Sequence, residues 1–373
     1  MNKHTPYYHK LAAAGAKFQD RGGFATINFL TSIEDEHRAV RERVGIFDVY
    51  YQVAVEIRGP DALRLLQRVL VNDVRRIADG GGMYSPVCDA QGGMLDDLTC
   101  FRFSGDRFWI SPTPSRVAAI CAHLERQAAG LRAAVTNLGY ANAYLSIQGP
   151  KSRDLLAQLT DTELSTSVLP YFRFAQGTVA GVPSTMISRT GYSGELGYEL
   201  FYPIEYAEHL WDSVVAAGAS FDVRICGMKT MRSLRIEKRY LLYGLDVSTE
   251  TDPLSAGLGW AVRFDERDFL GRAALEQIAA RGVTRALCLL QTEGFHPIVQ
   301  GESVLAAGEV VGTVTSGDPA YTLGKTLAFA YLPAGLTQAG TRVEINIKDR
   351  DTPVSAQVVP GVPYDPERRR ARV

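Results

Sequence analysis

The sequence contains one strand–turn–helix unit twice, and this duplication constrains the fold more than any other feature. Residues 53–66 and residues 143–156 each read as an alternating strand, a Gly-Pro dipeptide and a helix with paired leucines. We expect each proline at the first helical position, where its missing N–H is not needed. Two copies are too few for a solenoid. The duplication therefore predicts two related α+β halves.

A third region begins after a helix predicted over residues 272–280. From residue 285 onward the pattern shows strands and turns without a convincing helix, with strands over residues 286–291, 310–315, 327–331, 342–347 and 354–359. This pattern predicts a small C-terminal β-domain. Earlier in the chain, amphipathic helices are predicted over residues 33–44, 116–127 and 204–217.

Charge and cysteine usage narrow the functional classes. The 373 residues include 40 basic and 41 acidic side chains, so we expect neither nucleic acid nor an anionic membrane as partner. No segment has the roughly 18 apolar residues of a membrane span, and the N-terminus lacks the apolar core of a signal peptide. Five cysteines without a C-x-x-C pair and six scattered histidines indicate a reducing compartment and no metal site. The simplest expectation is a cytoplasmic protein.

A glycine turn followed by two carboxylates is the most informative local motif. Gly92 and Gly93 are expected to supply the positive φ angles of a hairpin turn, and the strand that follows carries Asp96 and Asp97. Neighbours on a strand point to opposite faces. At most one aspartate can then face solvent on the outer side, and the other faces a packed surface or a pocket, where an unpaired carboxylate is costly. A solvated turn with acidic flanks is the alternative.

Residues 190–199 carry three glycines, two tyrosines and two glutamates. Glycines let a loop approach a flat ligand closely, and tyrosines offer stacking faces. A carboxylate can accept two parallel N–H bonds from an amidine-like ring edge, as in pterins and guanines. A plain glycine-rich hairpin is the alternative.

The helix predicted over residues 231–240 places Arg232, Arg235 and Arg239 on neighbouring turns. Such a face could hold a di-acid tail, although a solvated, salt-bridged helix is the more common case. His37 lies on a helix rich in Glu and Arg and is expected to be exposed. The arginine-rich residues 368–372 are expected to form a solvated tail.

Taken together, these motifs resemble the aminomethyltransferase (glycine cleavage T-protein) family of tetrahydrofolate-dependent one-carbon enzymes. The resemblance runs along almost the whole chain, through residues 45–49, 71–74, 84, 92–97, 188–195, 240–244, 253–260, 268–272, 314–317 and 323–325. It implies an α+β cloverleaf of three domains around a central folate channel. The domain limits that we expect are 1–50 with 141–280 for the first, folate-binding α+β domain, 51–140 for the second α+β domain, and 281–373 for a C-terminal β-domain of barrel or jelly-roll type.

The resemblance also assigns residues to the cofactor. The catalytic aspartate of the family matches Asp97, and its pterin-contacting residues match Tyr84, Tyr192, Glu199 and Tyr240. An acid beside a secondary amine can accept or relay its proton as folate N5 becomes a nucleophile.

Three departures from the family pattern concern the substrate. Residues 50–53 replace a Ser-His-Met-Gly run, residues 110–113 lack the asparagine of the family, and residues 229–232 move the folate-binding arginine out of register. We therefore place Tyr50, Tyr51 and Thr113 on the substrate side, and keep Arg232 as a candidate for cofactor binding.

These departures favour a tetrahydrofolate-dependent demethylase or methyltransferase, which moves a methyl group from O, S or N of a small methylated substrate to N5. Residues 88–95 and 108–111 resemble the dimethylsulfoniopropionate demethylase branch, and residues 231–238 resemble the folate domains of dimethylglycine and sarcosine dehydrogenases. One alternative is the aminomethyltransferase of glycine cleavage, which forms methylene-tetrahydrofolate and would bind the lipoyl carrier protein. Another is a non-catalytic folate-binding protein, whose Lys-Gly-Cys-x-x-Gly-Gln motif is missing here.

Overall fold

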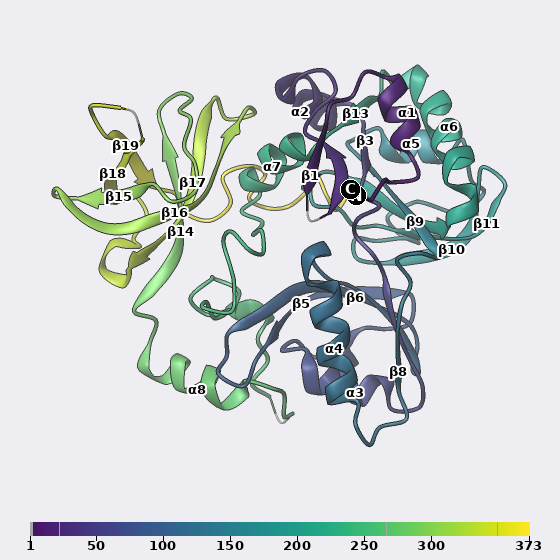
Figure 1. The fold of residues 1–373 in the computed structure, drawn as a ribbon, viewed down its shortest axis with the longest axis horizontal. Helices are drawn as coiled ribbons and strands as arrows, with labels where there is room; N and C mark the ends of the chain where they lie inside the picture. The colour runs from purple at the N-terminus through teal and green to yellow at the C-terminus, as the bar shows by residue number, and fades with distance from the viewer. Residues whose placement is uncertain (1–2, 22, 266, 349) are drawn as a thin grey trace.

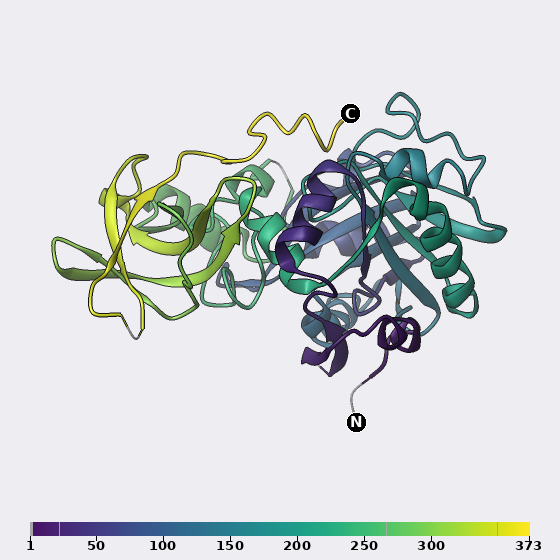
Figure 2. The same cartoon turned by 90° about the horizontal axis from the view of Figure 1, so that it is seen from above.

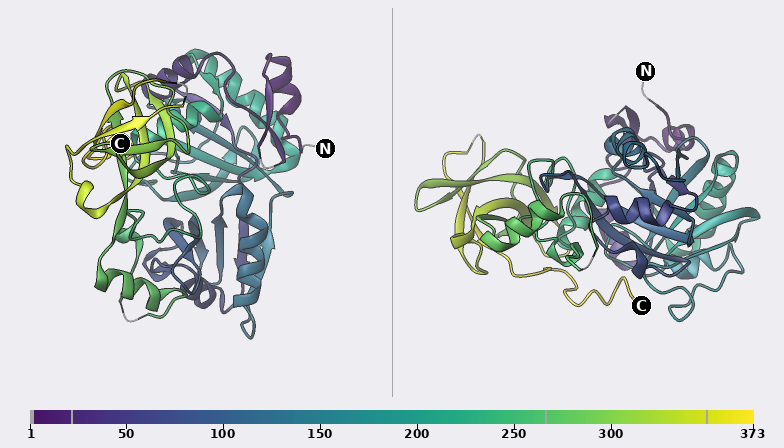
Figure 3. Two further views of the ribbon diagram at one scale, coloured as in Figure 1. Left: turned by 60° about the vertical axis from the view of Figure 1, so that its left-hand side comes forward. Right: turned by 90° about the horizontal axis from the view of Figure 1, so that it is seen from below.

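The computed structural model describes residues 3–21, 23–265, 267–348 and 350–373. It has three lobes, each built on its own sheet (Figure 1), and Figure 3 shows the same arrangement from two further sides. One sheet has six strands, another has five, and six further strands close a barrel. This confirms the predicted α+β class with a C-terminal barrel. No helix in the described part of the chain is long and apolar enough to cross a membrane.

The first lobe is assembled from two separate stretches of the chain. Its sheet has the order β10-β11-β12-β9-β3-β13, with β3 (Gly45–Asp48), β9 (Asn142–Gln148), β10 (Phe174–Val179), β11 (Val182–Ser188), β12 (Gly197–Pro203) and β13 (Arg224–Cys226). Its helices are α1 (Tyr8–Ala13), α2 (Ile33–Glu42), α5 (Ser152–Leu156), α6 (Ala207–Gly218) and α7 (Met228–Glu237), and a hairpin of β1 (Phe18–Arg21) and β2 (Phe24–Ile27) lies beside them. The helices predicted over residues 33–44 and 204–217 are confirmed as α2 and α6, the second with a 3-10 first turn.

The second lobe is continuous in sequence. Its sheet has the order β5-β6-β7-β4-β8, with β4 (Val55–Arg58), β5 (Gly81–Cys88), β6 (Met94–Ser104), β7 (Arg107–Ser111) and β8 (Ala134–Asn137). Helices α3 (Ala62–Val69) and α4 (Val117–Gln127) pack on one face of this sheet. The helix predicted over residues 116–127 is confirmed as α4.

The barrel follows α8 (Arg272–Arg281) and has the order β14-β17-β16-β15-β18-β19. Its strands are β14 (Arg285–Thr292), β15 (Ser303–Ala306), β16 (Glu309–Ala320), β17 (Lys325–Pro333), β18 (Arg342–Asn346) and β19 (Val354–Val358). All five predicted strands are present. The sequence misses β15, because four residues are too few for a period-two signal. We propose that these three sheets mark three domains with the limits given above.

The duplicated unit is visible in both halves. β4 leads to α3 through Gly59, and β9 leads to α5 through Gly149, with φ angles of 135° and 130°. In each copy the glycine carbonyl accepts the N–H of the residue three positions later, Ala62 or Ser152, at 2.9 Å. The prolines therefore occupy a turn before each helix, and their predicted place at the first helical position is wrong. Proline is favourable at the second position of such a turn, because its fixed φ is the one that this position requires.

The two open sheets face each other, and strand alternation decides what they bury. Leu145 of β9 and Leu200 of β12 belong to the core beneath the first sheet. Their neighbours Tyr144 and Phe201 point to the opposite face and share a cluster with Trp109 of the second sheet. The rings of Trp109 and Phe201 lie 6.1 Å apart. The two lobes thus meet through a second, aromatic core.

Backbone hydrogen bonds also join the two open sheets. The N–H of Gly82 in β5 donates to the carbonyl oxygen of Phe172 at 2.7 Å. The N–H of Phe174 donates to the carbonyl oxygen of Gly80 at 2.9 Å. Phe172 has a φ of 66°, in the left-handed region that non-glycine residues rarely adopt.

The C-terminal segment returns from the barrel across the first lobe (Figure 2). Lys238 Nζ lies 3.0 Å from Asp365 Oδ2, and Arg370 Nε lies 2.8 Å from Glu195 Oε2. The expectation of a fully solvated arginine tail is therefore wrong for Arg370.

His37 is also not exposed, in contrast to the sequence expectation. Only 1% of its surface is accessible, and its ring nitrogens lie 2.8 Å from Ser233 Oγ and from Thr322 Oγ1. The face of α2 that carries it packs against α7 and the loop after β16, which the Glu- and Arg-rich local sequence does not reveal.

The duplicated glycines provide a test of the fold. A Cβ on Gly149 would lie 2.4 Å from the carbonyl oxygen of Arg43 and 2.8 Å from that of Val40. Gly130 also has a positive φ, but a Cβ there would meet nothing within 4 Å. Gly130→Ala should cost about 1–2 kcal/mol of unfolding free energy from backbone strain alone. Gly149→Ala should cost about 1–3 kcal/mol more, because the backbone must shift. Equal losses in urea denaturation would contradict this account.

Candidate active site

A cavity opens between the facing sheets and contains about 1200 Å³ of empty space, its open mouth included. Its wall comes from β5, β6, β9, β12 and α7, and from the loops at residues 190–192 and 241–243. Most of the lining side chains are aromatic, acidic or hydroxyl-bearing: Tyr51, Tyr84, Asp97, Thr99, Phe101, Ser111, Thr113, Tyr144, Ser146, Phe172, Thr190, Tyr192, Glu199, Phe201 and Tyr243.

The glycine turn before β6 is packed rather than solvated. Gly92 has the expected positive φ of 85°. Gly93 does not have a positive φ. A glycine is needed there because the backbone of Thr249 packs against it, and a Cβ would lie 2.2 Å from the carbonyl oxygen of Thr249. Asp89 Oδ1 accepts the N–H groups of Gln91 and Gly93, both at 2.9 Å. These contacts fix the start of β6.

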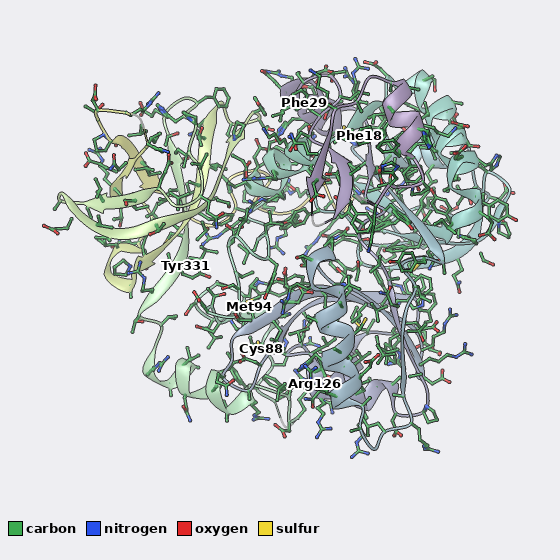
Figure 4. All side chains as sticks on the ribbon, in the orientation of Figure 1. Phe18, Phe29, Cys88, Met94, Arg126 and Tyr331 are labelled. Atoms are coloured by element: carbon green, nitrogen blue, oxygen red, sulfur yellow. The ribbon has the colours of Figure 1, made fainter. Side chains whose placement is uncertain are left out.

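The hairpin is held from the barrel side as well. Cys88 and Met94 flank the turn and share an apolar cluster with Leu275 of α8, against which Tyr331 of the barrel packs. Figure 4 labels Cys88, Met94 and Tyr331 in this region. The start of the strand that carries the two aspartates is therefore anchored by the turn and by α8.

The two aspartates point to opposite faces of β6. Asp97 lines the cavity, and Tyr84 Oη on the neighbouring strand β5 donates to its Oδ2 at 2.8 Å. Burial raises the pKa of Asp97 to about 6, although the Tyr84 bond acts in the lowering direction. Asp96 is fully buried on the helix side of the sheet. Asp97 thus exchanges its proton near neutral pH.

Glu199 of β12 faces the same cavity from the first lobe. Its Oε2 accepts the hydroxyl of Thr190, and Tyr144 is a further hydrogen-bond partner. Burial raises its pKa, and both hydroxyl bonds act against that shift. The two acids therefore lie in a largely apolar wall, each oriented by hydroxyl donors.

Tyr192 lines the cavity, and its hydroxyl donates to the carbonyl of Leu241. Tyr240 is not among the lining residues. Its ring stacks on that of Tyr192, with centroids 5.7 Å apart and planes 21° apart. Tyr240 therefore supports the wall from behind.

Arg232 lines the cavity on α7 and pairs with Asp318 of the barrel at 3.0 Å. Arg235 is fully buried, with its Nη1 at 2.7 Å from Asp246 Oδ2. The alternative of a solvated, salt-bridged helix face is therefore wrong for this helix.

Of the three residues expected on the substrate side, two reach the cavity. Tyr51 and Thr113 line it. Tyr50 does not: it packs in the core of the first lobe, and its hydroxyl donates to the carbonyl of Gly139 at 3.2 Å. The two tyrosines lie in the turn after β3, which the Gln52 N–H closes on the carbonyl of Val49 at 2.8 Å, and this turn sends their side chains to different places.

Sequence reasoning missed several lining residues. Tyr144 could have been found, since it alternates with core residues Ala143 and Leu145 along β9. Phe172 and Met228 could not be found from the sequence. Phe172 lies in a loop and Met228 begins α7, and neither belongs to a local sequence pattern that indicates a cavity.

The comparisons with known proteins agree with this geometry. Residues 7–266 match the GCVT N-terminal domain family, and residues 285–365 match the glycine cleavage T-protein C-terminal barrel domain family. The aminomethyltransferase of Moorella thermoacetica is 38% identical over 349 residues, covering 93% of this chain and 94% of the relative. That of Desulfitobacterium hafniense (strain DSM 10664 / DCB-2) is 34% identical over 368 residues, covering 97% and 98%. The crystal structure of the glycine cleavage system aminomethyltransferase T from Bartonella henselae superposes with a TM-score of 0.89 at 28% identity, covering 97% of this chain and 98% of that one.

Fold, cavity and relatives together define a one-carbon transferase that uses tetrahydrofolate. The chain belongs to the aminomethyltransferase-like family of folate enzymes, whose two domain families cover most of its length.

The Tyr84–Asp97 bond generates a pH prediction. Activity that needs ionised Asp97 should be present above its pKa of about 6 and lost as the pH falls through it. Tyr84→Phe removes a bond that lowers this pKa, so the acid limb of the kcat/KM profile should move to higher pH. Tyr202→Phe is the matched control. It also removes one buried tyrosine hydroxyl, but the hydrogen bond lost is the one to Tyr7 in the core of the first lobe. An unmoved limb in Tyr84→Phe would contradict the assignment.

Glu199 generates a binding prediction. Glu199→Gln removes the charge at this end of the cavity, and hydrogen bonds to charged groups contribute about 1.5–3 kcal/mol. We expect tetrahydrofolate to bind on the order of 10- to 100-fold more weakly in calorimetric titration. The exposed Glu205 on the same lobe supplies the control Glu205→Gln, which should bind normally. Normal binding by Glu199→Gln would rule out its contact with the folate.

Proposed function

We propose that this chain transfers an aminomethyl-derived one-carbon unit to tetrahydrofolate, forming methylene-tetrahydrofolate. The observation that carries the proposal is Asp97, an acid with a raised pKa, oriented by Tyr84 in the shared cavity of the two open sheets. The relatives named aminomethyltransferases, similar over more than nine-tenths of their length, support this reaction over others of the family.

The cavity residues fit tetrahydrofolate. Tyr192 offers an aromatic face for a flat pterin. Glu199 keeps acceptor capacity for the amino-amide edge of the pterin, because the hydroxyls of Thr190 and Tyr144 occupy two of the about four lone-pair positions of a carboxylate. Arg232 lies on the wall beside the barrel and would meet the acidic tail of the folate. We propose these residues, with Tyr84 beside Asp97 and Tyr240 behind Tyr192, as the cofactor site.

Bound tetrahydrofolate supplies a secondary amine, N5, that accepts the one-carbon unit. Asp97 would take up the proton from this amine, and its raised pKa makes it a base matched to neutral pH. Tyr84 keeps one carboxylate oxygen fixed, so that the free oxygen presents a lone pair to the cavity. The aromatic wall limits water around the acid, which strengthens each of these interactions.

The donor of an aminomethyl group would be a lipoyl carrier protein, since the structural relative belongs to the glycine cleavage system. Tyr51 and Thr113 line the cavity and would meet the donor.

A second candidate is methyl transfer from O, S or N of a small methylated substrate to N5. It is favoured by the cavity wall itself, to which Tyr51, Met228 and Met231 contribute aromatic and thioether surface. Apolar surface of this kind accommodates methyl groups well.

The product distinguishes the two reactions. The protein is incubated with tetrahydrofolate and either an aminomethyl-loaded lipoyl carrier or a panel of methylated donors, and the folate is weighed by mass spectrometry. We expect methylene-tetrahydrofolate from the carrier. Methyl-tetrahydrofolate from a small donor, with no product from the carrier, would replace the first proposal by the second.

The role of Asp97 is tested separately. Asp97→Asn keeps the shape of the side chain and removes the base, so turnover should fall about 10²- to 10⁴-fold. Tetrahydrofolate affinity should stay within a few-fold of the original, because Glu199 and the tyrosines remain. Unchanged turnover would show that Asp97 is not the base.

A further inference from the structure

Asp96 is a fully buried carboxyl group in the middle of the second lobe's sheet. None of its surface is accessible. Among the residues that the structure describes, no Lys or Arg nitrogen forms an ion pair with it, whereas other buried acids such as Glu237 and Asp246 each pair with an arginine. An unpaired buried acid is costly to the fold and calls for a compensating role.

Both oxygens of Asp96 accept backbone N–H groups from residues of the cavity wall. Oδ1 accepts the N–H of Asp97, and Oδ2 accepts the N–H of Thr113, each at 2.9 Å. Both donors line the cavity. The Asp96 carboxyl group therefore lies behind the cavity wall and fixes the backbone of two residues in it, Asp97 and Thr113.

The bond from the Thr113 N–H to Asp96 lies just beyond the end of the hydrogen-bonded pairing between β6 and β7. The last pair between β6 and β7 is Thr99 with Ser111, so the chain beyond Ser111 has no ladder partner on β6. Pro112 and Pro114 flank Thr113 and carry no N–H. The Thr113 N–H is therefore the one backbone donor of this triplet, and Asp96 is its acceptor.

Asp96 also interacts electrostatically with Asp97. Burial, with the charge of Asp97 second, raises the pKa of Asp96 to about 7. Asp97, with its lower pKa of about 6, therefore ionises first, and its charge then favours the protonated form of Asp96.

Other titratable and charged groups also lie near this pair. The charge of Asp96 acts to raise the pKa of Tyr84, on β5, and the pKa of Tyr243, in the loop at residues 241–243. Arg116, after β7, donates to the carbonyl of Leu95 at 3.0 Å and lies 5.4 Å from the ring centre of Tyr243. Asp246 adds a further negative charge near Asp97.

We propose that Asp96 is a positioning residue, which holds the backbone of Asp97 and Thr113 in the cavity wall through its two accepted N–H bonds. This inference rests on the proposed role of Asp97 as the base. Asp96 itself is not among the residues that line the cavity.

The first test compares Asp96→Asn with Asp89→Asn. Asp89 is the matched control, because it also accepts two backbone N–H groups on the same hairpin, from Gln91 and Gly93, outside the cavity wall. Asp96→Asn keeps one acceptor and turns an amide toward the other donor. We expect its kcat to fall about tenfold or more, while its KM for tetrahydrofolate changes only a few-fold. Asp89→Asn should keep the original kcat.

The second test needs no turnover. In the ligand-free protein, carboxyl-carbon NMR of labelled aspartates follows each acid directly. The titration midpoint of Asp96 should fall in Asp97→Asn by about one pH unit, because the charge that raises the Asp96 pKa is removed. The Asp97→Asn arm holds even if Asp96→Asn does not fold.

The outcomes separate the two proposals. An unchanged Asp96 midpoint in Asp97→Asn would overturn the coupling, and an Asp96→Asn enzyme with the original kcat would overturn the positioning role. If Asp97→Asn turns over normally, the assignment of the base fails instead, and a shifted Asp96 midpoint would still support the coupling.

Discussion

One buried ion pair joins the first lobe to the barrel. Arg235 of α7 has no accessible surface, yet it carries a charge where the first lobe, the loop after α7 and the barrel meet. Its guanidinium lies 2.7 Å from Asp246, donates to Ser316 at 2.9 Å and approaches Asp318 to 3.5 Å. Removing one partner of such a pair typically costs about 3–5 kcal/mol, because the other charge stays buried. The position of α7, and with it one wall of the cavity, depends on these carboxylates.

The chemistry of the cavity follows from how the two open sheets face each other. Alternation along β6 places Asp97 and Phe101 toward the cavity, and alternation along β12 places Glu199 and Phe201 there from the other side. Both acids therefore enter a space walled largely by aromatic rings, where ionisation is disfavoured and their pKa values rise. Hydroxyl donors limit the shift for each of them. The duplicated halves supply one acid each, and Asp246 links this site to the barrel by raising the pKa of Asp97 further.

The sequence predicted what depends on local pattern. The duplicated unit, the helices and five barrel strands followed from periodicity and turn residues, and the family motifs pointed to Tyr84, Asp97, Tyr192 and Glu199, which the structure brings together. What failed depends on contacts between distant segments. His37 is buried only because α7 and the loop after β16 cover it. No local rule could show that Tyr50 turns into the core, or that residues 364–370 return to pair with the first lobe.

The central claim is that the cavity between the open sheets holds tetrahydrofolate with its reactive nitrogen beside Asp97. A crystal structure with bound 5-methyltetrahydrofolate tests it most directly. We predict that N5 lies within hydrogen-bonding reach of the Asp97 carboxylate, that the amino-amide edge of the pterin meets Glu199, and that the ring lies against Tyr192. A folate bound outside this cavity, or bound within it with N5 turned away from Asp97, would contradict the account.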